Sequence, residues 1–275
     1  MNLCGIVLYN PDINRLEENI NAIVNQVDAI LLIDNGSKNI NVIFEKYNEN
    51  NKIYFEFNPK NEGIAKALNQ ILDYAKNNSY SWVMTLDQDS VCPSNIISEF
   101  EKYRDIENIG IICPYTIDRN ATESIKKNLY NEYVERCITS ASFINVNACY
   151  KIARFDEKMF IDLVDYDYSY QVTQASLKIL RIANVELLHQ LGNLKNENIL
   201  GRTVEVTNHN DIRKYYYSKN CVYLCKKYKK IKIMKLCIPK LWNLTVKTLL
   251  FEKNKKYKFK AICKGIIDGL TMQMY

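Results

Sequence analysis

Four short apolar runs within the first ninety residues constrain the fold of this chain more than any other feature. The runs are residues 3–9, 29–33, 53–57 and 82–86. Each run has the length of a strand, ends in small polar residues and is followed by a helical pattern such as that of Leu16, Ile20 and Ile23. Strands that alternate with helices form a parallel, doubly wound sheet, and the loops after the strands meet at one edge. The sequence therefore predicts an α/β fold with its site at that edge.

The fourth run ends in two aspartates, Asp87 and Asp89, that are separated by one residue. Two carboxylates at the end of a buried strand repel each other unless a cation lies beside them. Mg²⁺ and Mn²⁺ prefer oxygen ligands together with the phosphates of a substrate. The pair therefore predicts a site for a metal and a diphosphate, and the ordinary alternative for so short a pattern is an acidic turn after a strand.

Two further strand ends carry residues that suit a nucleotide. In the segment 34–37, the Asp34 carboxylate can accept the imide N–H of a pyrimidine base, while Gly36 lets the backbone pass close to the nucleotide. In the segment 61–63, backbone N–H groups before a helix, together with Lys66, can face phosphate or ribose. The ordinary alternatives are an Asn-Gly turn for the first segment and helix capping for the second.

These motifs, in their order and spacing, resemble those of the family 2 glycosyltransferases, and the chain is similar to the rhamnosyltransferase branch of that family. The resemblance covers about residues 3–225. The segments that carry it are Tyr9-Asn10-Pro11, Asp34-Asn35-Gly36-Ser37, Asn61-Glu62-Gly63-Ile64-Ala65, Thr85-Leu86-Asp87-Gln88-Asp89-Ser90, and residues 137–142, 155–162, 164–167 and 187–192. It implies a GT-A fold, a nucleotide-diphosphate sugar as donor and an inverting transfer to an acceptor hydroxyl.

The resemblance also implies which residues hold the donor and its divalent metal, Mg²⁺ or Mn²⁺. It assigns Asp89 to the metal, and Asp87 to the ribose or to the metal through water. His189 matches a family position that faces the diphosphate, and we expect it as a third metal ligand, although a lone histidine after an apolar run is commonly structural. The nucleotide-sugar contacts that we predict are Tyr9, Asn10, Asp34, Asn35, Gly36, Asn61, Gly63, Lys66, Asp87, Gln88, His209 and Arg213. The last two belong to a segment resembling one that closes over the donor diphosphate as a lid.

The acidic segment 162–167 matches the part of the family that carries the catalytic base. Asp165 occupies the position of that base, which removes the proton of the acceptor hydroxyl during direct displacement. Asp167, two residues further on, points elsewhere on either a strand or a helix. Asp162 lies three residues before Asp165 and would share its helical face, so we expect it as the alternative base. Without the other motifs, an acidic helix start stabilised by the helix dipole would explain the segment.

Charge separates the end of the chain from the rest. Residues 214–275 contain sixteen lysines and only two acidic residues, whereas the whole chain has a net charge of +6, so the preceding part is net acidic. Lysines interleaved with apolar residues predict a pair of basic amphipathic helices. Such helices lie on anionic membrane surfaces or pack on the catalytic domain, and their apolar stripes would also allow a homodimer. We expect no nucleic-acid partner, because the lysines accompany no recognisable nucleic-acid module.

The expected organisation is a catalytic domain over residues 1–210 followed by a helical extension over residues 211–275. The nucleotide-sugar half of the catalytic domain is expected at about 1–115 and the acceptor half at about 116–210. Nine cysteines without a Cys-x-x-Cys pair indicate reduced thiols. The N-terminus has no signal-type pattern, and no apolar run reaches 18 residues. We therefore expect a cytoplasmic protein, peripherally associated with the inner face of the cell membrane.

The function that follows is transfer of a sugar, rhamnose from dTDP-rhamnose, onto a lipid-linked or growing bacterial surface polysaccharide. Loop shapes decide donor choice in this fold, so UDP-galactose, UDP-glucose or a UDP-amino sugar is the alternative donor. A non-catalytic membrane-associated scaffold is a second class of function, and a nucleotidyltransferase that releases pyrophosphate is a third. Release of a nucleoside diphosphate separates the glycosyltransferase from both.

Overall fold

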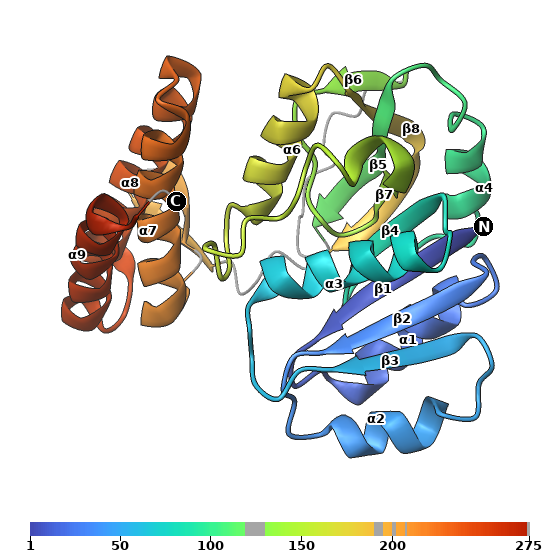
Figure 1. The fold of residues 1–275 in the computed structure, drawn as a ribbon. Helices are drawn as coiled ribbons and strands as arrows, with labels where there is room; N and C mark the ends of the chain where they lie inside the picture. The colour runs from blue at the N-terminus through green and yellow to red at the C-terminus, as the bar shows by residue number, and fades with distance from the viewer. Residues whose placement is uncertain (119–129, 190–194, 200–201, 207, 274–275) are drawn as a thin grey trace. The chain divides into compact units, whose positions relative to one another are not determined.

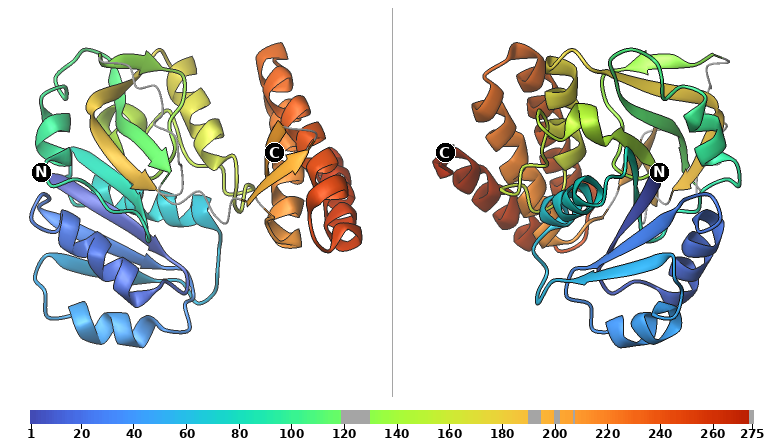
Figure 2. Two further views of the ribbon diagram at one scale, coloured as in Figure 1. Left: turned by 180° about the vertical axis from the view of Figure 1, so that it is seen from behind. Right: turned by 45° about the vertical axis from the view of Figure 1, so that its right-hand side comes forward.

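The computed structural model describes residues 1–118, 130–189, 195–199, 202–206 and 208–273 (Figures 1 and 2). The chain forms two compact units. The first unit consists of Met1–Lys158 and Val164–Gln190, and the second of Met159–Leu163 and Leu191–Tyr275. The N-terminal strands and the glycosyltransferase-like motifs up to residue 158 thus lie in the first unit, and the basic end of the chain lies in the second.

An eight-stranded sheet forms the centre of the first unit, with the strand order β3-β2-β1-β4-β7-β5-β8-β6 within the described residues. The strands are β1 Asn2–Leu8, β2 Ala29–Asp34, β3 Ile53–Phe57, β4 Trp82–Asp87, β5 Ile109–Asp118, β6 Glu132–Val134, β7 Ser142–Asn145 and β8 Lys178–His189. Only β7 and β6 run antiparallel to their neighbours. The predicted doubly wound, mostly parallel sheet is therefore confirmed, and β1 to β4 all end at the same edge.

Helices cover both faces of this sheet (Figure 2). They are α1 Ile13–Ile23, α2 Ile40–Tyr47, α3 Ile64–Asn77, α4 Ile96–Glu101, α5 Val146–Cys149 and α6 Val164–Gln174. Leu16 of α1, Ile43 of α2 and Phe100 of α4 share a buried cluster with Cys4, Ile6 and Leu8 of β1. Since side chains alternate along a strand, Gly5 faces the other way, and there it lies against Ile71 of α3. This alternation is why one strand can be buried on both faces.

The second unit contains the basic end of the chain. Its elements are β9 Lys195–Ile199, β10 Arg202–Val206, α7 Asp211–Tyr228, α8 Ile231–Phe251 and α9 Lys255–Thr271. The predicted helical extension is confirmed, although the described part of this unit has three helices where the sequence predicted a pair. The hairpin of β9 and β10 was not predicted. None of the described helices is both long and apolar enough to cross a membrane.

Two glycines let α9 pack closely on α7. A Cβ atom at Gly265 would lie 2.3 Å from the carbonyl oxygen of Tyr215, and one at Gly269 would lie 2.7 Å from that of Lys219. Both distances are shorter than any real Cβ contact, and the obstructing atoms are backbone. The hydroxyl of Tyr215 also donates to Asp268 at 2.7 Å. The spacing Gly-x-x-x-Gly places both glycines on one face of α9, so this face sets how near the helices approach.

We expect Gly265→Ala to destabilise the second unit by about 1–3 kcal/mol, because the added methyl group overpacks the contact between α7 and α9. By helix propensity alone the same substitution would stabilise by up to about 1 kcal/mol. The sign of the change in melting temperature, measured by scanning calorimetry, therefore tests the packing directly. Lys260→Ala, at an exposed position of α9, is the control and should leave the transition nearly unchanged.

Candidate active site

The loops that follow β1, β2 and β4 are tied together by hydrogen bonds at the carboxyl edge of the sheet. The side-chain oxygen of Gln88 accepts the Tyr9 N–H at 2.8 Å, and its amide nitrogen donates to the Tyr9 carbonyl at 3.4 Å. The Asn10 N–H donates to the Ser37 hydroxyl at 2.8 Å, while the Asn10 side chain accepts the Lys38 N–H at 2.9 Å. Tyr9, Asn10 and Gln88 thus belong to one connected rim, and their contact with the donor stays a prediction.

Asp34 and Gly36 form a tight turn at the end of β2. Asp34 is buried, with 2% of the residue exposed. Its carboxylate accepts the N–H groups of Gly36 and Ser37, each at 3.1 Å. Gly36 has a φ of +81°, and a Cβ atom there would lie 2.8 Å from the backbone of Lys60. Glycine is therefore required by both the conformation and the close approach of the next loop. The base contact that we predicted for Asp34 stays a prediction.

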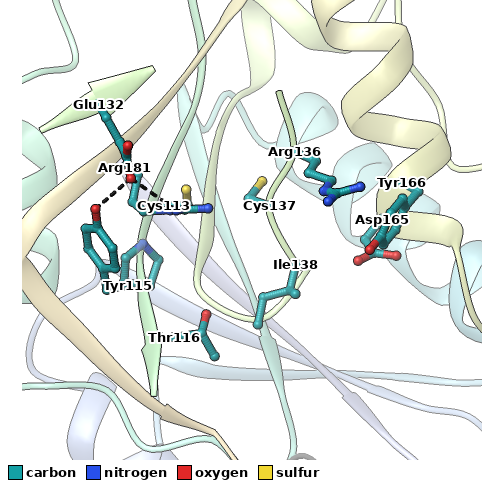
Figure 3. A pocket seen from close by; sticks show the side chains of 11 residues that line it. Cys113, Tyr115, Thr116, Glu132, Arg136, Cys137, Ile138, Asp165, Tyr166 and Arg181 are labelled. Carbon is teal, nitrogen blue, oxygen red and sulfur yellow. Dashed lines mark hydrogen bonds and ion pairs between the residues drawn. The ribbon is translucent and has the colours of Figure 1, made fainter. Parts of the chain in front are cut away.

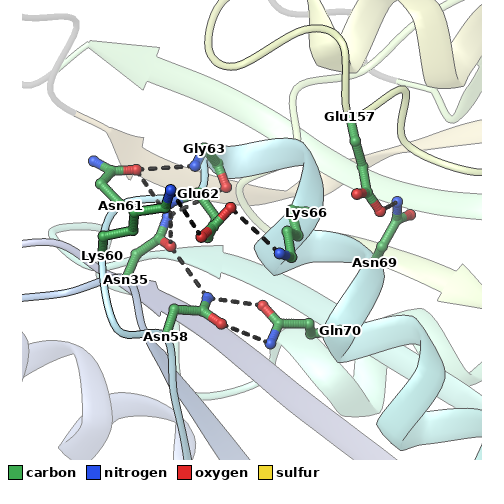
Figure 4. A network of polar contacts seen from close by, with 10 residues as sticks. All are labelled: Asn35, Asn58, Lys60, Asn61, Glu62, Gly63, Lys66, Asn69, Gln70 and Glu157. Atoms are coloured by element: carbon green, nitrogen blue, oxygen red, sulfur yellow. Dashed lines mark hydrogen bonds and ion pairs between the residues drawn. The ribbon is translucent and has the colours of Figure 1, made fainter.

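The amide of Asn35 connects the turn after β2 to the loop after β3 (Figure 4). Its nitrogen donates to the Asn61 side chain at 3.1 Å and to the Gly63 carbonyl at 3.2 Å. Its oxygen accepts from the Asn58 side chain at 3.1 Å and from the Glu62 N–H at 3.0 Å. Two donor and two acceptor positions are all that such an amide offers. In this arrangement Asn35 orders the two loops and has no hydrogen-bonding capacity left over.

Polar contacts continue from this loop into α3. Asn58 and Gln70 exchange two amide hydrogen bonds of 2.9 and 3.0 Å. Lys66, which we expected to face phosphate or ribose, lies with its ammonium 3.3 Å from the Glu62 carboxylate. Its side chain is 41% exposed, so this pair is a weak surface contact that a stronger anion can displace.

Three side chains that had no task assigned from the sequence hold the Asp87–Asp89 turn. Asn19, fully buried on α1, donates to the Asp87 carbonyl at 2.6 Å. The Asp87 N–H donates to the Ser140 hydroxyl at 3.2 Å, and Ser140 donates to Ser90 at 2.9 Å. Ser140 lies in the motif 137–142, so the resemblance pointed to it without giving its task. Asn19 had no signal, because one asparagine in an amphipathic helix resembles any other.

The strand pairing brings the backbone of His189 near this turn. His189 is the last residue of β8, opposite Asp118 of β5. Leu188, just before it, forms a bridge with Val91, two residues after Asp89. The side chain of His189 lies outside what the structure describes, so its role as a metal ligand stays a prediction. Among the described residues, no three His, Cys, Asp or Glu side chains cluster as a complete metal site.

Asp165 is the second residue of α6 and lines a cavity of about 420 Å³ in the first unit (Figure 3). The lining residues are Cys113, Pro114, Tyr115, Thr116, Glu132, Arg136, Cys137, Ile138, Asp165, Tyr166 and Arg181. Asp167 is fully buried and accepts the Gln171 amide at 2.7 Å. The two aspartates therefore have different surroundings, and of the two only Asp165 lines this cavity.

The wall of this cavity combines paired charges with aromatic faces. Glu132 accepts the Tyr115 hydroxyl at 2.6 Å and pairs with Arg181 at 3.2 Å. The Arg136 guanidinium lies 4.8 Å from the centre of the Tyr166 ring. Donors, acceptors and flat apolar surfaces beside a carboxylate suit a ligand with many hydroxyl groups. We call this space the Asp165 cavity.

The prediction that Asp162 shares a helical face with Asp165 is wrong. The helix α6 begins only at Val164, and Asp162 and Leu163 adopt left-handed backbone conformations with φ of +68° and +63°. These two residues interrupt the helical backbone, so a spacing of three residues does not place the side chains of Asp162 and Asp165 on one helical face. Asp162 belongs to the second unit, where Arg213 Nε donates to its Oδ1 at 3.0 Å.

A second cavity, of about 400 Å³, lies within the second unit. It is lined by Asp162, His209, Arg213, Lys214, Tyr217, Lys240, Asn243, Leu244, Lys247 and Glu252, and we call it the basic cavity. His209 and Arg213, which we predicted as donor contacts, thus lie together here. Burial, followed by the charges of Arg213 and Lys214, lowers the pKa of His209 to about 4, so its imidazole is neutral at pH 7.

Comparison with known sequences identifies the family of this chain. A model of the glycosyl transferase family 2 matches residues 4–159. The chain is 25% identical to the dTDP-rhamnosyl transferase RfbF of Shigella flexneri, over 96% of this chain and 94% of that protein. It is 30% identical to the bifunctional glycosyltransferase pgtA of Dictyostelium discoideum, over 39% of this chain and 15% of that protein.

Solved structures agree on the fold. GalNAc-T7 with UDP, GalNAc and Mn²⁺ matches with a TM-score of 0.63 and 12% identity, over 99% of this chain and 56% of that one. Residues 1–349 of S. aureus TarS with UDP-GlcNAc match with a TM-score of 0.54 and 14% identity, over 98% of this chain and 72% of that one. With its GT-A fold and a family model that matches more than half of its length, the chain belongs to glycosyl transferase family 2 and is a glycosyltransferase similar to a rhamnosyltransferase.

Proposed function

We propose that this chain is an inverting, metal-dependent glycosyltransferase that moves rhamnose from dTDP-rhamnose onto a lipid-linked or growing bacterial surface polysaccharide. The observation that carries the proposal is Asp165, which lines a sugar-sized cavity at the start of α6. The choice of donor is supported by the similarity to a dTDP-rhamnosyl transferase along almost the whole chain. We assign donor binding to about residues 1–115, acceptor binding to about 116–210 and a supporting role to 211–275.

The donor is proposed to bind along the linked rim of loops after β1 to β4. Asp34 accepts the imide N–H of the thymine base, and Tyr9, Asn10 and Gln88 border the nucleoside. The segment 61–63 and Lys66 lie near phosphate or ribose. There the Lys66 ammonium leaves its ion pair with Glu62 and pairs with the more highly charged phosphate. Because Asn35 already orders these loops, little conformational entropy has to be lost when the nucleotide binds.

Asp165 is proposed to act as the general base. Its carboxylate takes the proton of the acceptor hydroxyl while that oxygen forms a bond to the anomeric carbon. The bond from the anomeric carbon to the diphosphate breaks in the same step, and the nucleoside diphosphate leaves with the electron pair. Attack from the face opposite the leaving group inverts the anomeric configuration without a covalent sugar intermediate.

The residues at the end of β4 fit a hard divalent cation. Asp87 and Asp89 offer carboxylate oxygens, and Mg²⁺ or Mn²⁺ is usually held by one or two carboxylates with substrate phosphates as further ligands. When bound, the cation would offset negative charge on the departing diphosphate. Asn19 and Ser140 fix the backbone of Asp87, so they hold its side chain at the edge where the phosphates are proposed to bind.

Release of nucleoside diphosphate from a panel of donors tests the proposed reaction. With dTDP-rhamnose, a divalent cation and a lipid extract as acceptor, we expect release that falls by more than tenfold in chelator. UDP-galactose, UDP-glucose and UDP-N-acetylglucosamine should be used more slowly. If nucleoside diphosphate is released faster from a UDP sugar than from dTDP-rhamnose, that UDP sugar is the donor and the assignment of rhamnose is wrong. Release of pyrophosphate would contradict a glycosyltransferase, and no release with any donor would favour a scaffold.

The exposed face of α8 is proposed to bind an anionic membrane surface. Ile231, Ile238, Trp242 and Leu249 are all exposed, Trp242 to 69%. Their spacings of 7, 4 and 7 residues place them in one stripe along the helix. Exposed lysines, Lys232 and Lys235 among them, lie on the same helix. Apolar side chains beside basic ones are the pattern of helices that lie in the headgroup region of anionic bilayers.

We expect the chain to cosediment with vesicles that contain phosphatidylglycerol and to be released as salt is raised. Trp242→Glu should weaken this binding at least about tenfold, because burying one large apolar side chain is worth about 1.5–3 kcal/mol. Ile267→Glu, at an exposed position of α9, serves as the control. The molecular mass in solution at increasing protein concentration tests the alternative. If Trp242→Glu leaves vesicle binding intact but prevents a rise in this mass that the wild type shows, the stripe is a homodimer contact instead.

A further inference from the structure

The wall of the Asp165 cavity contains two cysteines that the proposed reaction does not use. Cys113 lies on β5 and Cys137 in the loop between β6 and β7, and both line the cavity (Figure 3). Both are free thiols, and Cys113 is buried whereas Cys137 is partly exposed. A small solute that enters the cavity therefore meets two thiol groups.

The two thiols lie close enough to form a hydrogen bond with each other. This contact, together with burial, raises the pKa of Cys113. The same contact lowers the pKa of Cys137, against the opposing effects of burial and of the Asp165 charge. Since the two shifts are opposite, Cys137 is the thiol that loses its proton first, and Cys113 donates to its sulfur.

Two hydroxyl groups also lie beside the Cys137 sulfur. Its Sγ is 3.2 Å from Ser142 Oγ and 4.0 Å from Ser169 Oγ. Ser142 donates to the Ile138 carbonyl at 2.5 Å in the present arrangement, but a hydroxyl group can rotate to donate to a charged sulfur. These contacts favour the thiolate of Cys137 further. The thiolate is the form of cysteine that acts as a nucleophile.

We propose that Cys137 is a peroxide-reactive thiol in the Asp165 cavity and that Cys113 is its resolving partner. The Cys137 sulfur attacks one oxygen of hydrogen peroxide, the O–O bond breaks and hydroxide leaves, which gives a sulfenic acid. The Cys113 sulfur then attacks the Cys137 sulfur and forms a disulfide, while the hydroxyl group leaves with the Cys113 proton as water. Two electrons pass from the pair of thiols to the peroxide, and a dithiol reductant returns them.

The loop that carries Cys137 connects this chemistry to the proposed catalytic groups. The Cys137 N–H donates to Ser169 Oγ at 3.3 Å, and Ser169 lies one turn after Asp165 on the same face of α6. In the same loop, Ser140 accepts the Asp87 N–H at 3.2 Å. A disulfide that moves the loop therefore disturbs both Asp165 and the end of β4. The resulting loss of transfer rests on the proposed function, whereas the thiol chemistry does not.

Mapping of disulfides by mass spectrometry tests the thiol chemistry without any turnover. The intact chain is treated with hydrogen peroxide, alkylated and digested, and we expect a linked pair of peptides that contain Cys113 and Cys137. Cys113→Ser should stop at the sulfenic acid, which dimedone traps on Cys137, whereas Cys137→Ser should leave Cys113 reduced. Cys263→Ser, at another partly exposed cysteine, is the matched control and should form the same linked pair as the wild type. Circular dichroism establishes that the variants are folded.

Two results would overturn the assignment of these thiols. One is a wild type in which Cys113 and Cys137 stay unlinked, or in which linkage is confined to Cys221, Cys225 and Cys237 of the second unit. The other is oxidation of Cys113 in Cys137→Ser at the rate of the wild type.

Release of nucleoside diphosphate before and after oxidation tests the effect on transfer. We expect oxidation to lower the wild-type rate at least about tenfold, because a shift of about 1 Å in a catalytic group can cost about 10²-fold. Dithiothreitol should restore the rate, and a variant with both Cys113→Ser and Cys137→Ser should keep its own rate after peroxide. A disulfide that forms without any fall in release would overturn this effect. Failure of the proposed function gives a different result, which is no release from the reduced protein.

Discussion

Asp165→Asn is expected to lower the rate of sugar transfer by about 10²–10⁴-fold, the range that a positioned general base contributes. An amide of the same size lines the Asp165 cavity equally well but cannot take the proton of the acceptor hydroxyl. Donor binding should be unchanged, because the rim of loops that is proposed to bind the nucleotide lies at β1 to β4. The measurement is kcat with dTDP-rhamnose and lipid acceptor, together with the Kd for thymidine diphosphate.

Asp162→Asn is the matched comparison for this experiment. Asp162 remains the alternative base in our assignment, although its Oδ1 is engaged with Arg213 and its position on a shared helical face proved wrong. If Asp165 is the base, Asp162→Asn should keep kcat for sugar transfer within a few fold of the wild-type value, even if its Kd for thymidine diphosphate changes. A loss of transfer in Asp162→Asn, with activity retained in Asp165→Asn, would exchange the two roles.

The second large effect concerns Glu252, which binds two buried lysines. Its carboxylate and the side chain of Lys214 are each 1% exposed, and Lys258 is 8% exposed. Glu252→Ala leaves two buried ammonium groups without this carboxylate, and breaking a buried pair in this way costs about 3–5 kcal/mol. In a unit of this size that corresponds to a fall in Tm of at least about 12 °C. Scanning calorimetry, with the intact chain, measures the shift.

The pH dependence of the same variant identifies the cause. Burial lowers the pKa of Lys214, and the hydrogen bond that its ammonium donates to Glu252 opposes this shift. Without Glu252 the folded pKa falls further below the unfolded value of about 10.4. The unfolded state then binds more protons between these two values, so stability rises with pH in that window. The deficit of the variant should shrink as pH is raised towards 10, whereas a deficit caused by lost packing would not.

A surface pair supplies the contrast. Glu18 pairs with Arg15 at 2.8 Å on α1, where both side chains are about half exposed. Glu18→Ala should change stability by less than about 1 kcal/mol, because solvent screens the exposed pair. A similar effect for Glu18→Ala and Glu252→Ala would mean that the buried lysines lose their charge or reach water in the variant.

The sequence was a good guide where local pattern decides structure. The four apolar runs became β1 to β4, and the polar residues after them lie at one edge, because parallel strands joined by helices have no other arrangement. Asp87 and Asp89 therefore lie where they were predicted, at the end of β4. The separate basic end of the chain also followed from charge alone, and it forms the helices of the second unit.

Contacts between residues that are far apart in the sequence could not be predicted from local sequence patterns. The partners of Asn35 include Asn58 and Asn61, which are more than twenty residues away, and nothing in an asparagine tells which amide it will meet. The prediction for Asp162 failed because it assumed a helix through a position that takes a left-handed conformation without glycine. The basic cavity also went unnoticed, since it requires α7 and α8 to face each other.

The amide network around Asn35 also limits how this enzyme can change its donor. A substitution at Asn35, Asn58 or Asn61 removes a hydrogen bond from at least one other member, so such changes disturb two loops at once. Tyr9 takes part in the rim only through its backbone, and its exposed ring is not tied to those amides. New base or sugar preferences are therefore most accessible through side chains like that of Tyr9. In a directed-evolution library, altered donors should accumulate there while the network stays intact.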